Sequence, residues 1–355
     1  MSGLWQKAFY DIIYIMKKLL SFLILVLVVC GCAYFAYTNP EIVHSITSRI
    51  KGGYHIYIGD NQYKQKKLNR AIEHYKYALD LYPAHHTAWF NLGNLYVVAG
   101  EFYQAAEAYE QAIGYKPNFV KARMNLGVIL AEKLGDYDGA IKQYSAIQDI
   151  EPKKFLFFNN DKALKINKGL AYYNMGVAYK KKSLTSREKW EIKMVYLKNA
   201  LDSYEKASKI LPKDYDTRFN LALTQQLLGD FNNSGVNYCK AIALEPMNYD
   251  AHYNLAILLR RLKKYNESYE ELQKATILVM NSNDSSYRQR FVFEIMNELT
   301  GTIIAEKLNA SENPSKTQLT EQERESFDNV KYEDYKTCAS MKFFKAAIKE
   351  EKDKF

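Results

Sequence analysis

A pattern of small and bulky residues recurs along the middle of the chain with a period of about 34 residues. Its clearest copy contains Trp89, Gly93, Ala105 and Tyr109, and related copies follow one another over residues 52–282. A unit of this length cannot bury its apolar residues alone, so neighbouring units must stack on one another. The period therefore restricts this part of the chain to a repeat array, in which six copies are recognisable.

The spacing within each copy predicts a pair of helices. Gly93 and Ala105 stand twelve residues apart, and two small side chains at this distance allow consecutive helices to touch. Pro117 ends the second helix, because its ring cannot continue one. The chain has only 7 prolines and 16 glycines, which also favours helices over a sandwich or barrel rich in tight turns. We therefore expect an all-α fold.

This frame resembles the tetratricopeptide-repeat family. The resemblance implies a right-handed superhelical solenoid of about six helical hairpins, closed by a C-terminal capping helix. It also implies that the first helix of each hairpin lines an inner groove, and that the partners are other proteins, held as extended segments or as subunits.

The fourth copy departs from the pattern, because Gly176 and Ala200 are 24 residues apart. The extra residues, around 182–195, fall at the turn between the two helices, and Ser186 is a candidate N-cap. We expect a lengthened hairpin there. The apolar segment Phe155–Phe158 is expected to fold back over it, with an exposed docking patch as the alternative.

The amino-terminal segment has the features of a membrane-targeting sequence. Residues 19–37 contain no charge and are long enough, at about 28 Å as a helix, to cross a bilayer. Lys17 and Lys18 precede this run, which predicts a cytoplasmic segment 1–18, a single-pass signal-anchor helix in the inner membrane, and a periplasmic array. Residues 38–51 would form a juxtamembrane linker. With this segment included, the chain resembles a membrane-anchored, bacterial type of tetratricopeptide protein.

A lipoprotein signal is the alternative. From Met16 the sequence reads MKKLLSFLILVLVVCGC, in which Gly31 fits a lipobox and Cys32 would be acylated. Cys30 is unusual at its place in that motif, and the residues after Cys32 stay apolar, so we favour the transmembrane span. Both readings export the rest of the chain.

Beyond the array, three further segments are expected. Residues 283–306 read as the capping helix, 307–328 as a polar linker and 329–355 as an amphipathic helix. The last segment contains Cys338, which would pair with Cys239 in an oxidising compartment, although we expect two unpaired thiols.

The sequence offers no chemistry typical of an enzyme. Its six histidines are scattered, it contains no GxSxG or phosphate-binding glycine loop, and no residues stand at metal-ligand spacing. The net charge of +9 is spread along the chain rather than gathered in a nucleic-acid footprint. We expect no catalytic activity, no cofactor, no metal and no nucleic-acid partner.

The predicted inner face carries a row of carboxamides beside aromatic rings. Its candidate binding residues are Asn91, Asn125, Asn174, Asn220 and Asn254, with Phe90, Tyr173, Phe219 and Tyr253 adjoining them. A carboxamide both donates and accepts, so it can pair with the N–H and C=O of a bound peptide. The row resembles the asparagine ladder of some peptide-binding tetratricopeptide arrays. In the alternative interpretation, the asparagines bond to neighbouring hairpins.

These observations favour a membrane-tethered scaffold that mediates protein–protein interactions and helps to assemble an envelope complex. A more specific alternative is a structural part of a periplasmic machine, such as a flagellar motor ring or collar or a secretion apparatus. A second alternative is an accessory factor that presents substrate to an envelope enzyme.

Overall fold

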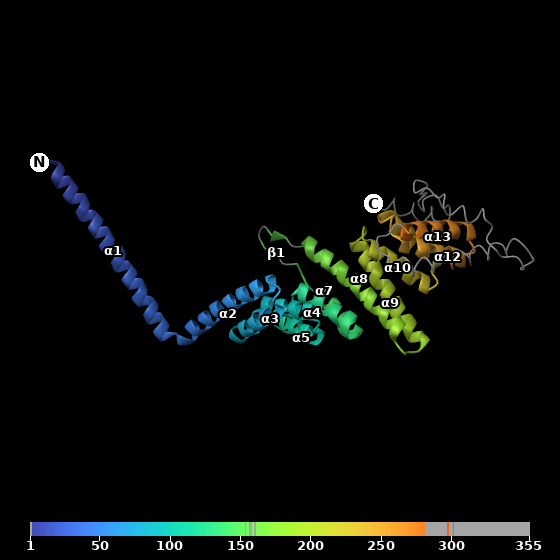
Figure 1. The fold of residues 1–355 in the computed structure, drawn as a ribbon, viewed down its shortest axis with the longest axis horizontal. Coiled ribbons are helices and arrows are strands. Elements are labelled where there is room, and N and C mark those ends of the chain that lie inside the picture. The colour runs from blue at the N-terminus through green and yellow to red at the C-terminus, as the bar shows by residue number, and fades with distance from the viewer. Residues whose placement is uncertain are drawn as a thin grey trace, which may run out of the picture. The chain divides into compact units, whose positions relative to one another are not determined.

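A computed structural model describes residues 2–152, 154–155, 158–159 and 161–280, together with Asn297 and Gly301. Its elements group into two compact units, Met1–Ala122 and Arg123–Phe355. Nearly all of the described residues are helical, as Figure 1 shows, and each unit is treated by itself below. The expected capping helix 283–306, linker 307–328 and amphipathic helix 329–355 lie outside the described residues, apart from those two single positions.

The first unit contains α1 and two hairpins, α2 with α3 and α4 with α5. Its helices are α1 (Ser2–Thr38), α2 (Pro40–Lys64), α3 (Leu68–Leu81), α4 (His86–Ala99) and α5 (Phe102–Tyr115). Proline is common at the first position of a helix, and Pro40 is the first residue of α2. The expected linker 38–51 is therefore wrong from residue 40 onward, because these residues belong to α2, the first helix of the first hairpin.

The second unit contains four hairpins. Their elements are α6 (Val120–Ile129) with the π-helix η1 (Leu130–Leu134), α7 (Tyr137–Gln148), α8 (Asp161–Thr185), α9 (Trp190–Ile210), α10 (Tyr215–Leu227), α11 (Phe231–Leu244), α12 (Tyr249–Arg261) and α13 (Tyr265–Met280). The π-helix explains why the third copy is one residue longer than the others. A π turn accommodates one additional residue without breaking the helix.

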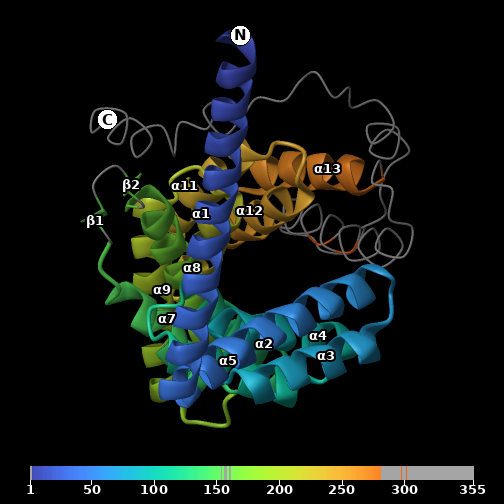
Figure 2. The same cartoon turned by 90° about the vertical axis from the view of Figure 1, so that its left-hand side faces the viewer.

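The fourth hairpin is lengthened, as expected. Its two helices, α8 and α9, have 25 and 21 residues and lie alongside each other (Figures 1 and 2). The N-cap of α9 is Lys189, so the expected cap at Ser186 is wrong; the Ser186 hydroxyl accepts from the backbone of Glu188 instead. Before α8, the strands β1 (Lys154–Phe155) and β2 (Phe158–Asn159) pair antiparallel, which an all-α expectation did not include.

Four of the six described hairpins close through a glycine that lies against a tyrosine ring, and the last two have alanine at that place. A Cβ atom added to Gly93 would stand 2.6 Å from the ring of Tyr109, and one added to Gly176 would stand 2.6 Å from that of Tyr204. Where alanine replaces this glycine, as at Ala222, its carbonyl accepts a hydrogen bond from the buried Ser234 hydroxyl. The small residues therefore admit both the ring and the second helix.

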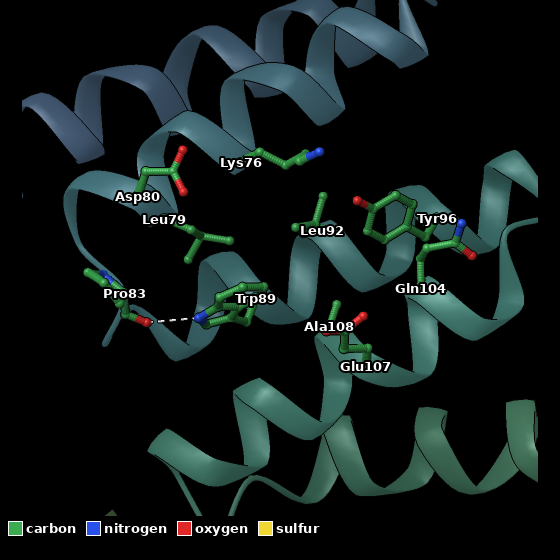
Figure 3. A pocket seen from close by; sticks show the side chains of 10 residues that line it. All are labelled: Lys76, Leu79, Asp80, Pro83, Trp89, Leu92, Tyr96, Gln104, Glu107 and Ala108. Carbon is green, nitrogen blue, oxygen red and sulfur yellow. Dashed lines mark hydrogen bonds between the residues drawn. The ribbon is translucent and has the colours of Figure 1, made fainter.

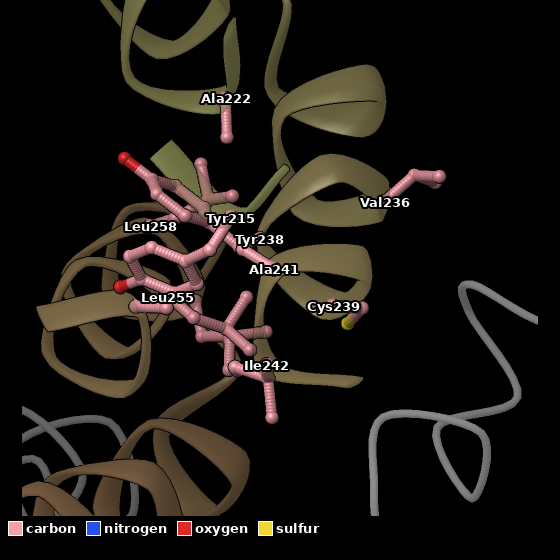
Figure 4. Close-up of a cluster of buried hydrophobic side chains, with 11 residues drawn as sticks. Tyr215, Ala222, Val236, Tyr238, Cys239, Ala241, Ile242, Leu255 and Leu258 are labelled. Carbon is pink, nitrogen blue, oxygen red and sulfur yellow. The ribbon is translucent and has the colours of Figure 1, made fainter. Parts of the chain in front are cut away.

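The core is built from such contacts repeated from one hairpin to the next. Figure 4 shows the cluster in which Tyr215, Tyr238, Leu255 and Leu258 pack between α10, α11 and α12. Cys239 belongs to the same cluster and is disulfide-bonded, against the expectation of an unpaired thiol. Cys30 and Cys32 are free and exposed.

Candidate functional site

The nine candidate groove residues all lie on the first helices of hairpins. Phe90 and Asn91 are on α4 in the first unit; in the second, Asn125 is on α6, Tyr173 and Asn174 on α8, Phe219 and Asn220 on α10, and Tyr253 and Asn254 on α12. Every one of them is partly exposed. The repeat spacing therefore places them at two adjacent positions, one for the aromatic residues and one for the asparagines, and each remains within reach of a ligand.

In the first unit, Asn91 is part of a short hydrogen-bond chain. Its Nδ2 donates to the Tyr75 hydroxyl at 3.1 Å, and that hydroxyl donates to Asp60 at 2.5 Å. Burial and the bond to Asp60 raise the pKa of Tyr75, so the phenol stays protonated. Asn91 thus connects its own helix to the preceding hairpin while its carbonyl oxygen remains available.

In the second unit, Asn220 joins two hairpins. Its Oδ1 accepts from Lys180 at 2.5 Å, and its Nδ2 donates to the Asp216 carbonyl and the Tyr173 hydroxyl, at 2.9 and 3.3 Å. Burial, with the nearby charge of Lys181, lowers the pKa of Lys180 to about 8. This cluster brings an amine, an amide and a phenol together on one partly exposed face.

The remaining asparagines differ in their contacts. Asn254 donates to the Asp250 carbonyl at 2.8 Å, one turn earlier in its own helix. Asn125 has a polar interaction too, whereas no side-chain hydrogen bond of Asn174 is recorded within the described residues. The row is therefore not uniform: Asn91 and Asn220 act as struts between hairpins, and Asn174 is the member most available to a ligand.

The aromatic residues of this face rest on the buried tyrosines. Phe90 lies 5.8 Å from the ring of Tyr109, and Phe219 lies 5.9 Å from that of Tyr238. Tyr173 contacts Tyr204 in the same way, and the Tyr204 hydroxyl is buried without a hydrogen-bond partner in the described part of the chain. These contacts fix the rings, so an extended ligand would meet a preformed surface.

A cavity of about 560 Å³ opens elsewhere, between α3, α4 and α5 (Figure 3). Leu79, Trp89 and Leu92 form its apolar wall, and Asp80 and Glu107 stand at its edge. The Trp89 Nε1 donates to the Pro83 carbonyl at 2.8 Å, which fixes the orientation of the indole. Sequence reasoning missed this cavity, because Trp89 was counted only as a core residue.

Comparison with known protein families identifies the type of repeat in the array. A model of the tetratricopeptide repeat matches residues 58–102 and 91–154. These matches coincide with helices α2 to α7, whose hairpins show the expected contact of small residue and tyrosine. The chain is a tetratricopeptide-repeat protein. As such it is a scaffold for protein–protein interaction.

Several solved structures resemble this tetratricopeptide protein at low sequence identity. PilW, a widely conserved type IV pilus biogenesis factor, has 15% identity and a TM-score of 0.49, over 68% of this chain and 98% of PilW. PilF of Pseudomonas aeruginosa has 15% identity and a TM-score of 0.48, over 70% and 99%. YrrB, described as having an unusual peptide-binding site, has 17% identity and a TM-score of 0.44, over 61% and 96%. No curated protein matches the chain.

The amino-terminal helix of the tetratricopeptide protein contains a stretch that could cross a membrane. Residues Met16–Phe35 have a mean hydropathy of 2.3, and none of the residues in this stretch whose burial is described is buried. The stretch begins three residues before the predicted span of 19–37. Among the described residues, no group of three histidine, cysteine or acidic side chains could hold a metal ion.

Proposed function

We propose that α1 anchors this protein in the inner membrane as a single-pass helix, with residues 1–18 in the cytoplasm and the repeat array in the periplasm. The exposed apolar stretch Met16–Phe35 supports the anchor, and Lys17 and Lys18 support the orientation, because positive charge favours the cytoplasmic side. The helix continues without interruption through Cys32 to Thr38, which favours a span over acylation at Cys32.

The bonded state of Cys239 supports the exported location. Disulfides form and persist in oxidising compartments such as the periplasm and are rare in the cytosol. Cys239 is disulfide-bonded and buried in the fifth hairpin, whereas the two cysteines of the apolar helix are free. This bond therefore supports a periplasmic rather than a cytoplasmic array.

The array, we infer, binds extended protein segments and thereby helps to assemble an envelope complex. Binding uses the asparagine face, the partly exposed side of the first helices that carries Asn91 in the first unit and Asn125, Asn174, Asn220 and Asn254 in the second. The observation that carries this proposal is the set of partly exposed carboxamides and fixed aromatic rings at two adjacent repeat positions of successive hairpins. Carboxamides suit a peptide backbone, since they donate and accept without regard to side-chain sequence. The protein is proposed to act as a binding component and not as an enzyme.

A topology measurement tests the anchor. A reporter that is active only outside the cytoplasm, fused after Phe355, is expected to be active, and the full chain should stay with membranes after alkaline extraction. Replacing Cys32 with serine should change neither the apparent mass nor the membrane association. Loss of an acyl label in that variant would instead identify a lipoprotein, and reporter activity only in the cytoplasm would reverse the topology.

A further inference from the structure

Most described hairpins contain the same side-chain pair between their two helices. The first partner lies on the first helix, four residues before its small contact residue (Gly59, Gly127, Ala222 or Ala256), and the second lies on the second helix. The recorded pairs are His55 with His74 at 3.1 Å, Arg123 with Gln143 at 2.8 Å, Arg218 with Asn237 at 3.3 Å, and His252 with Glu271 at 2.5 Å. Each pair fills the groove beside the first helix with polar groups that satisfy one another.

The second hairpin breaks this rule. In this hairpin, Trp89 occupies the repeat position that His252 has in the sixth hairpin. The Trp89 Nε1 donates to the Pro83 carbonyl, and the His252 Nε2 faces the Pro246 carbonyl in the equivalent way. The second partner is Ala108, which is too short to cover the indole and carries no polar group. The cavity of about 560 Å³ lies at this place, so the missing partner side chain leaves an open site.

The charges around this Trp89 cavity (Lys76, Leu79, Asp80, Pro83, Trp89, Leu92, Tyr96, Gln104, Glu107 and Ala108) favour a cationic ligand. Asp80 and Glu107 are exposed, and neither forms an ion pair with any described residue. Lys76 is the one cation of the lining, so the site is net negative. An acidic ligand would be repelled there, and a wholly apolar one would make no use of the two carboxylates.

We propose that the Trp89 cavity binds an arginine side chain of a partner protein. The aliphatic part of that side chain fits against Leu79 and Leu92, and its planar guanidinium can stack on the indole while donating to Asp80 or Glu107. Trp89 and Asn91 are two residues apart and so point about 200° away from each other on α4. This site is therefore separate from the asparagine face and goes beyond the proposed function.

Binding of a matched pair of peptides tests the proposal. The probe is a short acetylated peptide with one central arginine, and its control has uncharged citrulline at that place. Titration into the full chain in detergent, with Trp5→Phe and Trp190→Phe so that Trp89 alone fluoresces, should give a saturable change. We expect the arginine peptide to bind about tenfold more tightly than the citrulline peptide, as a cation–π contact together with ion pairing implies.

Variants of the lining make the test specific. The double variant Asp80→Asn with Glu107→Gln should abolish the preference for arginine, and Ala108→Leu should fill the cavity and abolish binding. Lys76→Met should strengthen binding, because it removes the one opposing charge. Glu110→Gln removes one negative charge from the helix that carries Glu107, but outside the cavity, and should have no effect. Equal affinity for both peptides, or an unchanged preference in the double variant, would overturn the proposal.

Discussion

Replacing Glu271 with alanine is expected to lower the free energy of unfolding by about 3–5 kcal/mol. The Glu271 carboxylate is 1% exposed, and it accepts from His252 at 2.5 Å and from Lys274 at 2.7 Å. His252 is buried as well and also faces the Pro246 carbonyl, so both of its ring nitrogens meet oxygen acceptors. Removing the carboxylate takes away the acceptor that faces Nδ1 of this buried histidine, which costs more than the pair itself contributes.

Urea unfolding followed by circular dichroism measures this loss. The matched control is Glu270→Ala, which removes an equal, exposed charge next to it and should change stability by no more than about 0.5 kcal/mol. Amide hydrogen exchange should locate the loss in α12 and α13, because each hairpin of a repeat array contacts chiefly its neighbours. A loss no larger than that of the control would show that His252 and Glu271 do not form this pair.

The same contact makes part of the stability depend on pH. Burial acts to raise the pKa of Glu271, but the hydrogen bond from His252 and the charges of His252 and Lys274 outweigh it and lower the pKa below its ordinary value of 4.5. A lowered folded-state pKa contributes stability that is present above 4.5 and is lost as the pH falls through the folded value. The difference between the wild type and Glu271→Ala should therefore shrink below pH 4.5.

Replacing Tyr109 with alanine should also cost about 3–5 kcal/mol. The ring is 1% exposed and lies so close to Gly93 that an added Cβ would be 2.6 Å from it. No other group of the hairpin can fill the volume that the ring leaves, and Phe90 loses the surface on which it rests. Thermal unfolding of the variant would show the loss.

The variant Tyr109→Phe separates packing from hydrogen bonding. It keeps the ring and removes only the hydroxyl, which donates to Asn94 at 2.7 Å. We expect a loss of about 0.5–1.5 kcal/mol, the net contribution of one hydrogen bond. If phenylalanine cost as much as alanine, the hydroxyl and not the ring would be the main support of this hairpin.

The repeat spacing was sufficient to predict the hairpins. Gly93, Ala105 and Tyr109 specify a contact between two helices through volume alone, and volume can be read from residue type. The repeat spacing also shows that the third copy has one extra residue, but it does not show that this residue forms the π turn at Leu130–Leu134. A π turn and a longer loop absorb one residue equally well, and packing of α7 decides between them.

Other features depended on contacts that the spacing does not specify. Nothing after Pro40 breaks a helix, yet residues 40–51 were assigned to a linker because the repeat pattern begins only at residue 52. Asn91 and Asn220 can bond to a ligand or to Tyr75 and Lys180, and residue type cannot distinguish these choices. The Trp89 cavity depends on Ala108, which stands 19 residues later and becomes informative only once the other hairpins show what fills that place.

The measurement that tests the central claim most directly compares partner capture by wild type and by a variant with Asn125, Asn174 and Asn220 all replaced by alanine. Both full chains are crosslinked in intact envelopes, and the attached proteins are quantified by mass spectrometry. The three bonds should contribute about 1.5–4.5 kcal/mol together, so capture should fall by about tenfold or more and should depend little on salt. A triple variant that stays folded and membrane-bound, and still captures the same proteins in the same amounts, would contradict binding through the asparagine face.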